Sequence, residues 1–442
     1  MKGGTEMKNI VTIAGGGSGY TPGIVLTLLN NQDNFPVSEI RLYDIDEVRN
    51  SDMEIIVNYL LRKNKSNVKL VATLDPKIAF TGVDFIFSQI RVGGMEMREI
   101  DEKIPLKYGL VGQETCGLGG FSYGMRSMKG FLEMVQFIQD YAPDAWILNY
   151  TNPESIIAES VRRKFPNIKI INACDMTIGI EELIAKSFGY DRKNWITQYY
   201  GLNHFGWYHS IYDIKEGKDI MPSLIEKIRQ TGMNLDGLDA SWSKTYELMR
   251  YMIDKFPENL PNNYLEYYLY PNLIVENSNI NYTRANEIMD GRLKKIKETV
   301  KKIQNAGSQD EIQYKSDSHG QYIVDIAVSI LNNLNRRFML IVPNKGAIPN
   351  LRQDAVVEVP AYVNSRGVEP ISLREDIPDF HKGLMEAQVA AEKLLVDAFF
   401  EGSYKKALQA FTLNQSVPNA DVAKKVLDEF IEANGEYWVK LN

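Results

Sequence analysis

The first 175 residues alternate short apolar runs with segments in which apolar residues recur every three to four positions. Runs rich in Val, Ile and aromatic residues are typical of buried strands, and the longer spacing is typical of helices. This alternation predicts an α/β fold, a Rossmann-like, doubly wound parallel sheet with helices on both faces. The expected strands are Asn9–Ala14, Ile40–Asp44, Val68–Val71, Val83–Gln89, Trp146–Tyr150 and Lys169–Cys174, and the expected helices are Pro22–Asn31, Glu47–Arg62, the segment 125–138 and one that starts at Pro153.

The pattern changes after about residue 196. A β-rich stretch covers Thr197–Tyr212, and helical periodicity returns at Leu384–Phe400 and Ala420–Asn434. We therefore expect two domains: the Rossmann-like domain over residues 8–196 and a mixed α+β domain over residues 197–442.

A glycine-rich turn follows the first predicted strand and contains Gly15, Gly16, Gly17, Ser18 and Gly19. Glycines at this place let the backbone approach a pyrophosphate at the next helix's N-terminus. The run departs from G-x-G-x-x-G, because Tyr20 or Pro22 falls where the third glycine belongs, and a tight turn without a ligand is the alternative.

Asp44 strengthens the nucleotide interpretation, since it ends the second predicted strand. An acid there accepts the ribose hydroxyls of NAD and repels the additional phosphate of NADP. Strand, glycine turn, helix, strand and acid together predict that the chain binds NAD.

Charge and composition exclude several classes of partner. The formal net charge of −7 gives no general attraction to nucleic acid or anionic lipid, so a bound phosphate would need a local group of arginines. No apolar run has the length of a membrane span, and residues 1–9 show no signal sequence. Cys116 and Cys174 are the two cysteines, which implies no disulfide framework. We expect a cytoplasmic protein that binds neither nucleic acid nor membrane.

Cys174 and His204 are candidate metal ligands. Cys174 and Asp175 end the sixth predicted strand, and His204 lies within Gly201–Trp207. Two ligands cannot close a structural zinc site, so the metal interpretation requires an open site completed by substrate oxygens and water. The alternatives are a small buried hydrophobic cysteine and a hydrogen-bonded core histidine.

Three arginines are candidates for binding a phosphate. Arg91 and Arg98 follow the fourth predicted strand, and Arg284 lies further along the chain. Their planar guanidinium groups suit phosphate oxygens, and ordinary surface ion pairing is the alternative.

Tyr264 lies in a tyrosine-rich stretch and is a candidate base. Tyrosine removes a proton near neutral pH when a cation or metal lowers its pKa; otherwise such a stretch is aromatic core. His209, His319 and His381 have no interpretable setting and are taken as structural.

The order of these motifs resembles glycoside hydrolase family four, the NAD-dependent glycosidases. The resemblance covers almost the whole chain and is closest to the 6-phospho-α-glucosidases, which carry Asp after the metal-binding Cys where 6-phospho-β-glucosidases have Asn. Its motifs are Ile13–Ser18, Ile90–Gly93, Val111–Gly117, Asn149–Pro153, Cys174–Met176, Gly201–Trp207 and Thr283–Glu287.

The resemblance implies a lactate/malate dehydrogenase-like fold and a role for each candidate. The C-terminal domain would carry substrate, metal and oligomer contacts, in a homodimer or homotetramer. Cys174 and His204 would bind Mn²⁺ or a similar divalent ion, and Arg98, Asn152 and Arg284 would hold a phosphorylated disaccharide or glucoside. The catalytic residues would be Asp175 as acid, Tyr264 as base and Glu114 as the neighbour that makes the tyrosine more basic.

The resemblance also implies a redox route to hydrolysis, as this family is an exception among glycosidases. The sugar would be oxidised at C3 and deprotonated at C2, the aglycone would be eliminated, and water would add at C1. Thr177 and Leu118 depart from the family, which often has Pro at these places, and both lie near proposed site residues.

Three alternatives remain at this point. The chain is another specificity of the same family, such as a 6-phospho-β-glucosidase, or a simple NAD-dependent dehydrogenase, or a catalytically silent NAD sensor. A dehydrogenase has no use for the Cys174–His204 pair, and a sensor need not keep acid, base and phosphate-binding residues together.

Overall fold

A parallel sheet forms the N-terminal part of the protein. The computed structural model describes residues 8–238, 240–305 and 312–442; the N-terminal segment expected to lack a signal sequence lies mostly outside them. The parallel strands run in the order β3-β2-β1-β4-β5-β6, which is that of a doubly wound dinucleotide-binding sheet. The predicted fold class is confirmed. The strands are β1 (Asn9–Ala14), β2 (Val37–Tyr43), β3 (Lys69–Thr73), β4 (Phe85–Ser88), β5 (Trp146–Asn149) and β6 (Ile170–Ala173).

The sheet continues beyond β6 with antiparallel strands. β11 pairs with β6 through Leu340 opposite Ala173 and Ile341 opposite Asn172, and β12, β7, β8 and β10 follow. The boundary expected near residue 196 therefore crosses one continuous sheet, and the division into two domains stays a prediction. These strands are β7 (Trp195–Leu202), β8 (Phe205–Asp213), β9 (Lys218–Asp219), β10 (Leu260–Pro261), β11 (Arg336–Pro343), β12 (Val356–Asn364) and β13 (Gly367–Pro370).

Alternate residues of each parallel strand enter two different apolar cores. Phe85 and Phe87 of β4 belong to one core, and Ile86 between them belongs to the other. Successive side chains of a strand point to opposite faces, so both faces of the sheet are buried. One face is covered by α1 (Thr21–Asn30), α2 (Glu47–Lys63), α7 (Met176–Phe188) and α14 (Ser318–Leu331), and the other by α3 (Pro76–Phe80), α5 (Gly117–Tyr141), α6 (Glu154–Lys164), α15 (Asp379–Glu401), α16 (Tyr404–Leu413) and α17 (Ala420–Asn434).

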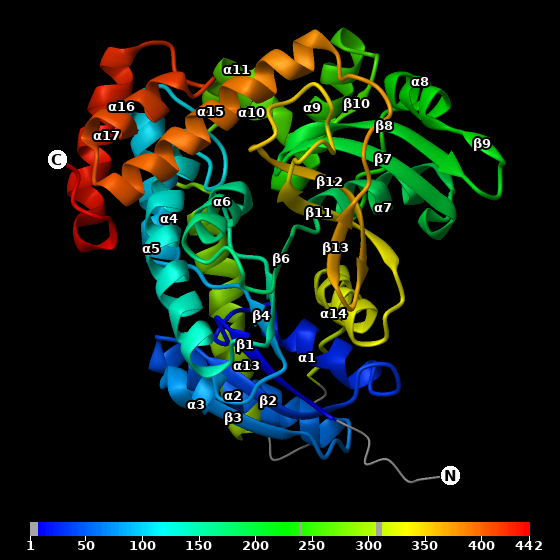
Figure 1. Ribbon diagram of the computed structural model, residues 1–442, viewed down its shortest axis with the longest axis vertical. Helices are drawn as coiled ribbons and strands as arrows, with labels where there is room; N and C mark the ends of the chain where they lie inside the picture. Colours follow the sequence, from blue (N-terminus) through cyan, green and yellow to red (C-terminus); the bar gives the residue numbers. More distant parts are fainter. Residues whose placement is uncertain (1–7, 239, 306–311) are drawn as a thin grey trace.

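Segments far apart in the sequence meet around the parallel sheet. The C-terminal helices α15–α17 lie against α4 and α5, and α13 returns to pack on α2 (Figure 1). Helices from the second half of the chain therefore pack against the N-terminal part of the protein. The remaining helices are α4 (Gly94–Lys107), α8 (Met221–Thr231), α9 (Ala240–Lys255), α10 (Glu266–Leu269), α11 (Pro271–Glu276), α12 (Arg284–Ile288), α13 (Lys294–Asn305), the 3₁₀ turns η1 (Arg192–Asn194), η2 (Asn263–Leu265) and η4 (Gly435–Tyr437), and the π-helical turn η3 (Met289–Leu293).

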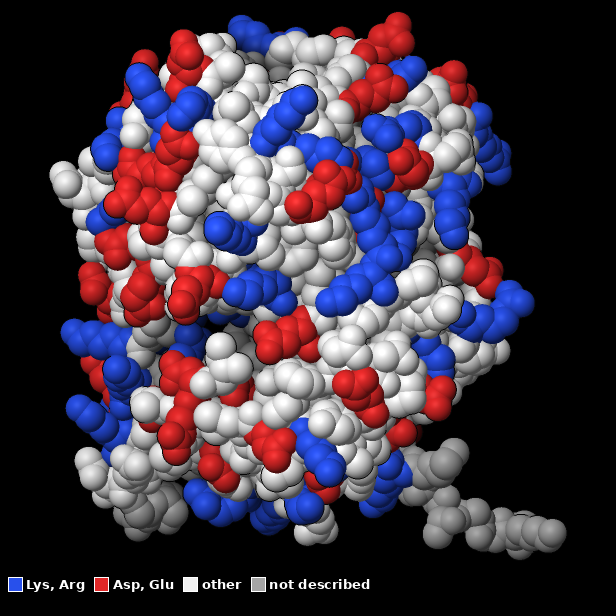
Figure 2. Space-filling view, turned by 60° about the vertical axis from the view of Figure 1, so that its left-hand side comes forward, with Lys and Arg blue, Asp and Glu red and all other residues white. Residues whose placement is uncertain are grey.

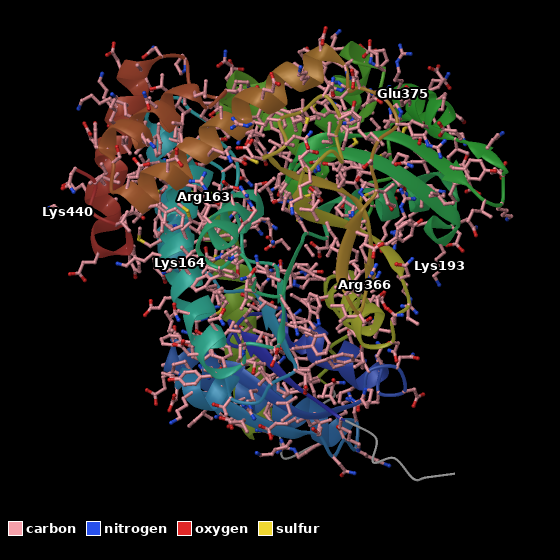
Figure 3. All side chains as sticks on the ribbon, viewed as in Figure 1. Arg163, Lys164, Lys193, Arg366, Glu375 and Lys440 are labelled. Atoms are coloured by element: carbon pink, nitrogen blue, oxygen red, sulfur yellow. The ribbon has the colours of Figure 1, made fainter. Side chains whose placement is uncertain are left out.

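Charged side chains of both signs are spread over the surface. Acidic and basic groups are interspersed on the face shown in Figure 2. Lys193, Arg366 and Glu375, labelled in Figure 3, are exposed at the outside of the molecule. Within the described residues, no helix is long and apolar enough to cross a membrane.

Candidate active site

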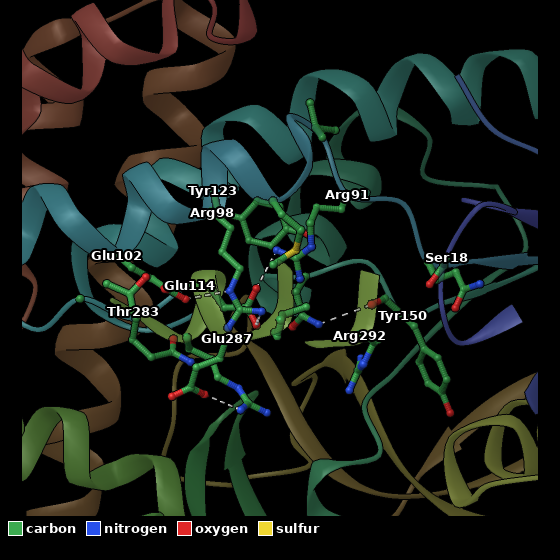
Figure 4. A pocket seen from close by; sticks show the side chains of 18 of the residues that line it. Ser18, Arg91, Arg98, Glu102, Glu114, Tyr123, Tyr150, Thr283, Glu287 and Arg292 are labelled. Atoms are coloured by element: carbon green, nitrogen blue, oxygen red, sulfur yellow. Dashed lines mark hydrogen bonds and ion pairs between the residues drawn. The ribbon is translucent and has the colours of Figure 1, made fainter. Parts of the chain in front are cut away.

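A cavity of about 1260 Å³ extends from the glycine-rich turn to the α9–α12 region. It lies at the carboxyl ends of the parallel strands, where open α/β sheets bind their ligands. Residues from both halves of the chain line it, among them Ser18 and Arg91 from the first half and Thr283 and Arg292 from the second (Figure 4). The residues predicted from the sequence that line the cavity are Gly15, Ser18, Gly19, Asp44, Arg98, Glu114, Asn152, Asp175, Tyr264 and Arg284.

The glycine turn between β1 and α1 is shaped by close backbone contacts. Gly15 has a φ of +81°, and a Cβ on it would lie 2.8 Å from the carbonyl oxygen of Gln89. A Cβ on Gly16 would lie 2.8 Å from Cβ of Leu42. The turn can therefore lie tight against β2 and β4 only with glycine at these positions.

Asp44 holds the turn from the neighbouring strand end. Its Oδ2 accepts a hydrogen bond of 2.9 Å from the backbone N–H of Gly17, and the residue lines the cavity. Asp44, Ser18 and Gly19 line the same end of the cavity, so that the glycine turn and one carboxylate lie side by side there. These features fit a dinucleotide: backbone for the pyrophosphate, helix α1 behind it and an acid for the ribose.

Cys174 and His204 meet behind the cavity. Cys174 follows β6 directly, and His204 lies in the two-residue turn between β7 and β8, with the left-handed φ of +63°. Its Nε2 lies 3.4 Å from Sγ of Cys174. A left-handed conformation outside glycine is uncommon, and such positions cluster at functional sites.

The donor set of this pair fits a metal with open coordination positions. Burial lowers the pKa of His204 to about 4, which leaves the imidazole neutral, the form that ligates metals. Burial raises the pKa of Cys174, so the thiolate needs a cation beside it. Within the described parts of the chain, no group of three or more His, Cys, Asp and Glu is placed to hold an ion. The protein would supply two ligands, and the other positions would be left to substrate and water.

Tyr264 packs directly against the metal-ligand candidates. Its ring meets that of His204 edge to face at 4.9 Å between centroids, and Trp242 stacks on it at 6.0 Å. Asn262 accepts a hydrogen bond from the backbone N–H of Tyr264 and fixes the 3₁₀ turn η2. Burial, followed by the negative charges of Cys116 and Glu114, raises the pKa of Tyr264. The phenol is therefore protonated at neutral pH unless a cation stabilises the phenolate.

Two arginines bracket Glu114 on the opposite wall (Figure 4). Nη1 of Arg91 lies 2.6 Å from Oε2 of Glu114, and Nη1 of Arg98 lies 3.0 Å from Oε1. Burial alone would raise the pKa of Glu114, but the charges of Arg91 and Arg98 outweigh it and the pKa is lowered. Glu114 is thus ionised, and it holds both guanidinium groups at the cavity wall.

Glu102 connects this arginine group to the segment that carries Arg284. Its Oε1 accepts from Nε of Arg98 at 2.7 Å, and its Oε2 accepts from the backbone N–H of Ala285 at 2.8 Å. Arg284 itself pairs with Glu287 at 2.7 Å and lines the cavity. One buried carboxylate therefore sets the positions of both predicted phosphate-binding arginines.

Asn152 and Asp175 complete the predicted set at the strand ends. Oδ1 of Asn152 is buried in the cavity wall and has no hydrogen-bond partner among the described residues. Such an acceptor is suited to a ligand hydroxyl. Oδ2 of Asp175 lies 2.9 Å from Nδ1 of His319. Burial would raise the pKa of Asp175, but the hydrogen bond from His319 and its charge outweigh burial and lower it.

His319 was expected from the sequence to be structural, but its position is at the candidate site. It lines the cavity at the start of α14 and contacts Asp175, which lies 144 positions earlier in the chain. His381 does pack as a structural residue, stacked on Trp207 at 3.9 Å, and His209 is exposed. Arg91, Arg292 and Tyr20 also line the cavity, although none was assigned a definite role from the sequence.

The two departures from the family pattern are well accommodated. Thr177 is buried, and its hydroxyl lies 3.5 Å from Oε1 of Glu358. Glu358 also accepts at 3.5 Å from Asn203, the neighbour of His204. Leu118 is buried in the first turn of α5. Neither side chain enters the cavity.

Comparisons with known proteins place the chain in a family. The model of family 4 glycosyl hydrolases matches residues 10–190, and the model of the family 4 glycosyl hydrolase C-terminal domain matches residues 199–417. The chain therefore belongs to glycosyl hydrolase family 4, as the motifs predicted.

Within this family, the chain is similar to enzymes that act on phosphorylated α-glucosides. It is 48% identical to the maltose-6'-phosphate glucosidase of Clostridium acetobutylicum, over 98% of this chain and 99% of that protein. A crystal structure of a 6-phospho-α-glucosidase from gut microorganisms, with NAD and Mn²⁺, has a TM-score of 0.96 at 39% identity, covering 99% of this chain and 100% of that one. A second, with NAD and glucose 6-phosphate, has a TM-score of 0.94 at 40% identity, covering 98% and 100%.

Proposed function

We propose that this protein hydrolyses 6-phospho-α-glucosides such as maltose 6'-phosphate, with NAD and Mn²⁺ as cofactors. One observation carries the proposal: a single cavity joins the glycine turn and Asp44 to Tyr264 and the arginine group. The Cys174–His204 pair lies beside it, with His204 against Tyr264. A dehydrogenase or a silent sensor has no need of this combination. The similarity to 6-phospho-α-glucosidases supports the same activity.

We assign each side of the cavity to one part of the substrate complex. The glycine turn and Asp44 would bind NAD, and Cys174 and His204 would hold the metal. Arg98, Asn152 and Arg284 would bind the sugar phosphate and ring hydroxyls. The buried Glu102 supports this assignment, since it holds Arg98 and the segment of Arg284 in one geometry.

The chemistry requires an acid and a base on opposite parts of the sugar. When bound, NAD⁺ supplies a hydride acceptor for C3, and the metal supplies a Lewis acid for the oxygens at C2 and C3. Tyr264 would take the proton from C2, and Asp175 would protonate the departing glycosidic oxygen. Glu114 would raise the basicity of Tyr264, in keeping with the direction in which its charge moves the pKa of the phenol.

Paired chromogenic substrates test the proposal. The protein is assayed with the α- and β-linked 4-nitrophenyl glucoside 6-phosphates and with the unphosphorylated α-glucoside, each with NAD⁺ and Mn²⁺. Rapid cleavage of the phosphorylated α-anomer alone is expected. Preference for the β-anomer would identify a 6-phospho-β-glucosidase, and steady NADH accumulation without cleavage would identify a dehydrogenase.

The family resemblance also implies a homodimer or homotetramer in the cytoplasm. Sedimentation equilibrium of the full chain measures the oligomeric state directly, and cell fractionation measures the location.

A further inference from the structure

Three aromatic rings and a guanidinium group pack against one another in the cavity wall. The ring of His319 lies between Tyr20, at 4.5 Å between centroids, and Tyr150, at 4.4 Å. The guanidinium carbon of Arg292 lies 4.8 Å from the centroid of the Tyr20 ring. Tyr20 is one of the two residues, with Pro22, at which the turn departs from the glycine pattern, and its side chain packs against His319. These contacts restrict the rotation of the His319 imidazole.

The backbone beneath His319 is equally constrained. Asp317 caps α14 by accepting a hydrogen bond from Gly320 N–H at 2.8 Å. A Cβ on Gly320 would lie 2.9 Å from Oγ1 of Thr27 and 3.0 Å from the backbone of Gly23, so α14 packs closely on α1. Helix α1, which follows the glycine turn, therefore fixes the position of the first turn of α14, which carries His319.

The hydrogen bond of His319 fixes its polarity. Asp175 lies next to Nδ1, so this nitrogen carries the hydrogen and donates to Oδ2 of the carboxyl at 2.9 Å. Nε2 is buried and lacks a hydrogen-bond partner within the described residues. His319 engages one oxygen of Asp175, and Asp175 lines the cavity.

We propose that His319 is a positioning residue for the acid: packed against Tyr20 and Tyr150, it donates from Nδ1 to one oxygen of the Asp175 carboxyl and so directs the other oxygen at the glycosidic oxygen of the substrate. That second oxygen carries the proton in the acid form, and its O–H bond breaks as the proton passes to the departing oxygen. This inference rests on the acid role of Asp175 in the proposed function. Asp175 follows Cys174 directly and is the N-cap residue of α7, where its side chain makes no capping hydrogen bond. Without the Nδ1 donor the carboxyl rotates away, and proton delivery to a poor leaving group fails.

Leaving-group dependence in the complete enzyme, with NAD⁺ and Mn²⁺, tests this role. Maltose 6'-phosphate needs protonation of its departing sugar oxygen, whereas a 4-nitrophenolate departs without much protonation. His319→Phe keeps a ring between Tyr20 and Tyr150 and removes the donor. We expect kcat on maltose 6'-phosphate to fall about 10- to 100-fold and kcat on the nitrophenyl substrate to fall less than about threefold, with KM little changed.

Two amide variants separate positioning from packing. His319→Asn places an N–H donor near the position of Nδ1, and His319→Gln places it near that of Nε2. Asn should restore most of the kcat on maltose 6'-phosphate and Gln should not. The comparison of the Asn and Gln variants still tests the role of His319 if the Phe variant does not fold. The control is His209→Phe, an exposed histidine outside the cavity, which should leave both rates unchanged.

Asp175→Asn, assayed alongside, distinguishes the possible failures. Suppose that Asp175→Asn loses more activity on maltose 6'-phosphate than on the nitrophenyl substrate. In that case, equal losses on both substrates in His319→Phe, or equal activities of His319→Asn and His319→Gln, would overturn the role of His319 and leave the acid role of Asp175 intact. If Asp175→Asn loses activity equally on both substrates, Asp175 is not the acid, and the inference about His319 fails with it. Binding of NAD⁺, followed by protein fluorescence, should be the same in the wild type and in all His319 variants.

Discussion

Arg284 offers a clean test of phosphate recognition, because its removal disturbs the fold little. Its side chain is 28% exposed, and its partner Glu287 is 43% exposed. Ion pairs of this kind contribute about 0–1 kcal/mol to stability. Arg98 is different: it is buried against Glu102 and Glu114, and its loss would leave the buried Glu102 without its ion-pair partner and Glu114 with Arg91 alone. Arg284→Met should therefore lower activity without lowering the melting temperature, whereas Arg98→Met should lower both.

The expected size follows from the chemistry of the contact. A charge-assisted hydrogen bond contributes about 1.5–3 kcal/mol. At about 1.4 kcal/mol per factor of ten, loss of the Arg284 contact should lower kcat/KM about 10- to 150-fold on a phosphorylated substrate. The effect on the unphosphorylated glucoside should be within about twofold, since that substrate never makes the contact.

The assay compares the α-linked 4-nitrophenyl glucoside with and without its 6-phosphate. Arg366→Met is the matched control, because Arg366 pairs with Glu369 at the same i,i+3 spacing and the same 2.7 Å but lies on the outer surface. A kcat/KM for Arg284→Met within twofold of that of Arg366→Met on the phosphorylated substrate would refute the role of Arg284.

Three further predictions address the cofactors and the base. Removal of metal with a chelator should abolish activity, and Mn²⁺ should restore it. Cys174→Ser and His204→Ala should bind Mn²⁺ far more weakly, as measured by titration calorimetry. Full activity of metal-free Cys174→Ser would contradict this prediction. Gly15→Ala should weaken NAD⁺ binding, because its Cβ would lie 2.8 Å from the Gln89 oxygen, whereas Gly82→Ala, at a similar φ but with open space around it, is the control whose binding should not change. Product formed in D₂O should carry deuterium at C2 by NMR, and Tyr264→Phe should lose most turnover while still binding NAD⁺; unlabelled product would point to direct displacement at C1.

Regular amphipathic elements could be predicted closely from the sequence. β1 and α17 have the predicted bounds, Asn9–Ala14 and Ala420–Asn434, because their apolar periodicity ends where burial ends. Strand β4 stops at Ser88, one residue before the predicted end, where the Gln89 side chain turns to donate to Thr21. The end of β4 thus depends on a contact with α1, and the apolar periodicity along the strand cannot predict that contact.

Helix α4 shows why other parts could not be predicted. It buries Arg98, Asp101 and Glu102 and contains Pro105, so its polar pattern is not that of an amphipathic helix. These charges are buried because they are paired, Asp101 with Arg126 of α5 and Glu102 with Arg98. The Asp101–Arg126 pair joins residues of two helices that only the folded chain brings together. The contact of His319 with Asp175 belongs to the same class.

The joint between β6 and β11 bears on how the protein handles its cofactor. A hinge between the nucleotide-binding part and the rest would have to break the ladder at Ala173–Leu340 and Asn172–Ile341, immediately before Cys174. The two walls of the cavity are therefore coupled rigidly at the metal-ligand candidates, and exchange of ligands falls to the turns and short helices at the rim. In a reaction that returns NAD to its starting state each cycle, the dinucleotide can remain in place while sugars come and go. Such a framework favours many turnovers for each cofactor captured.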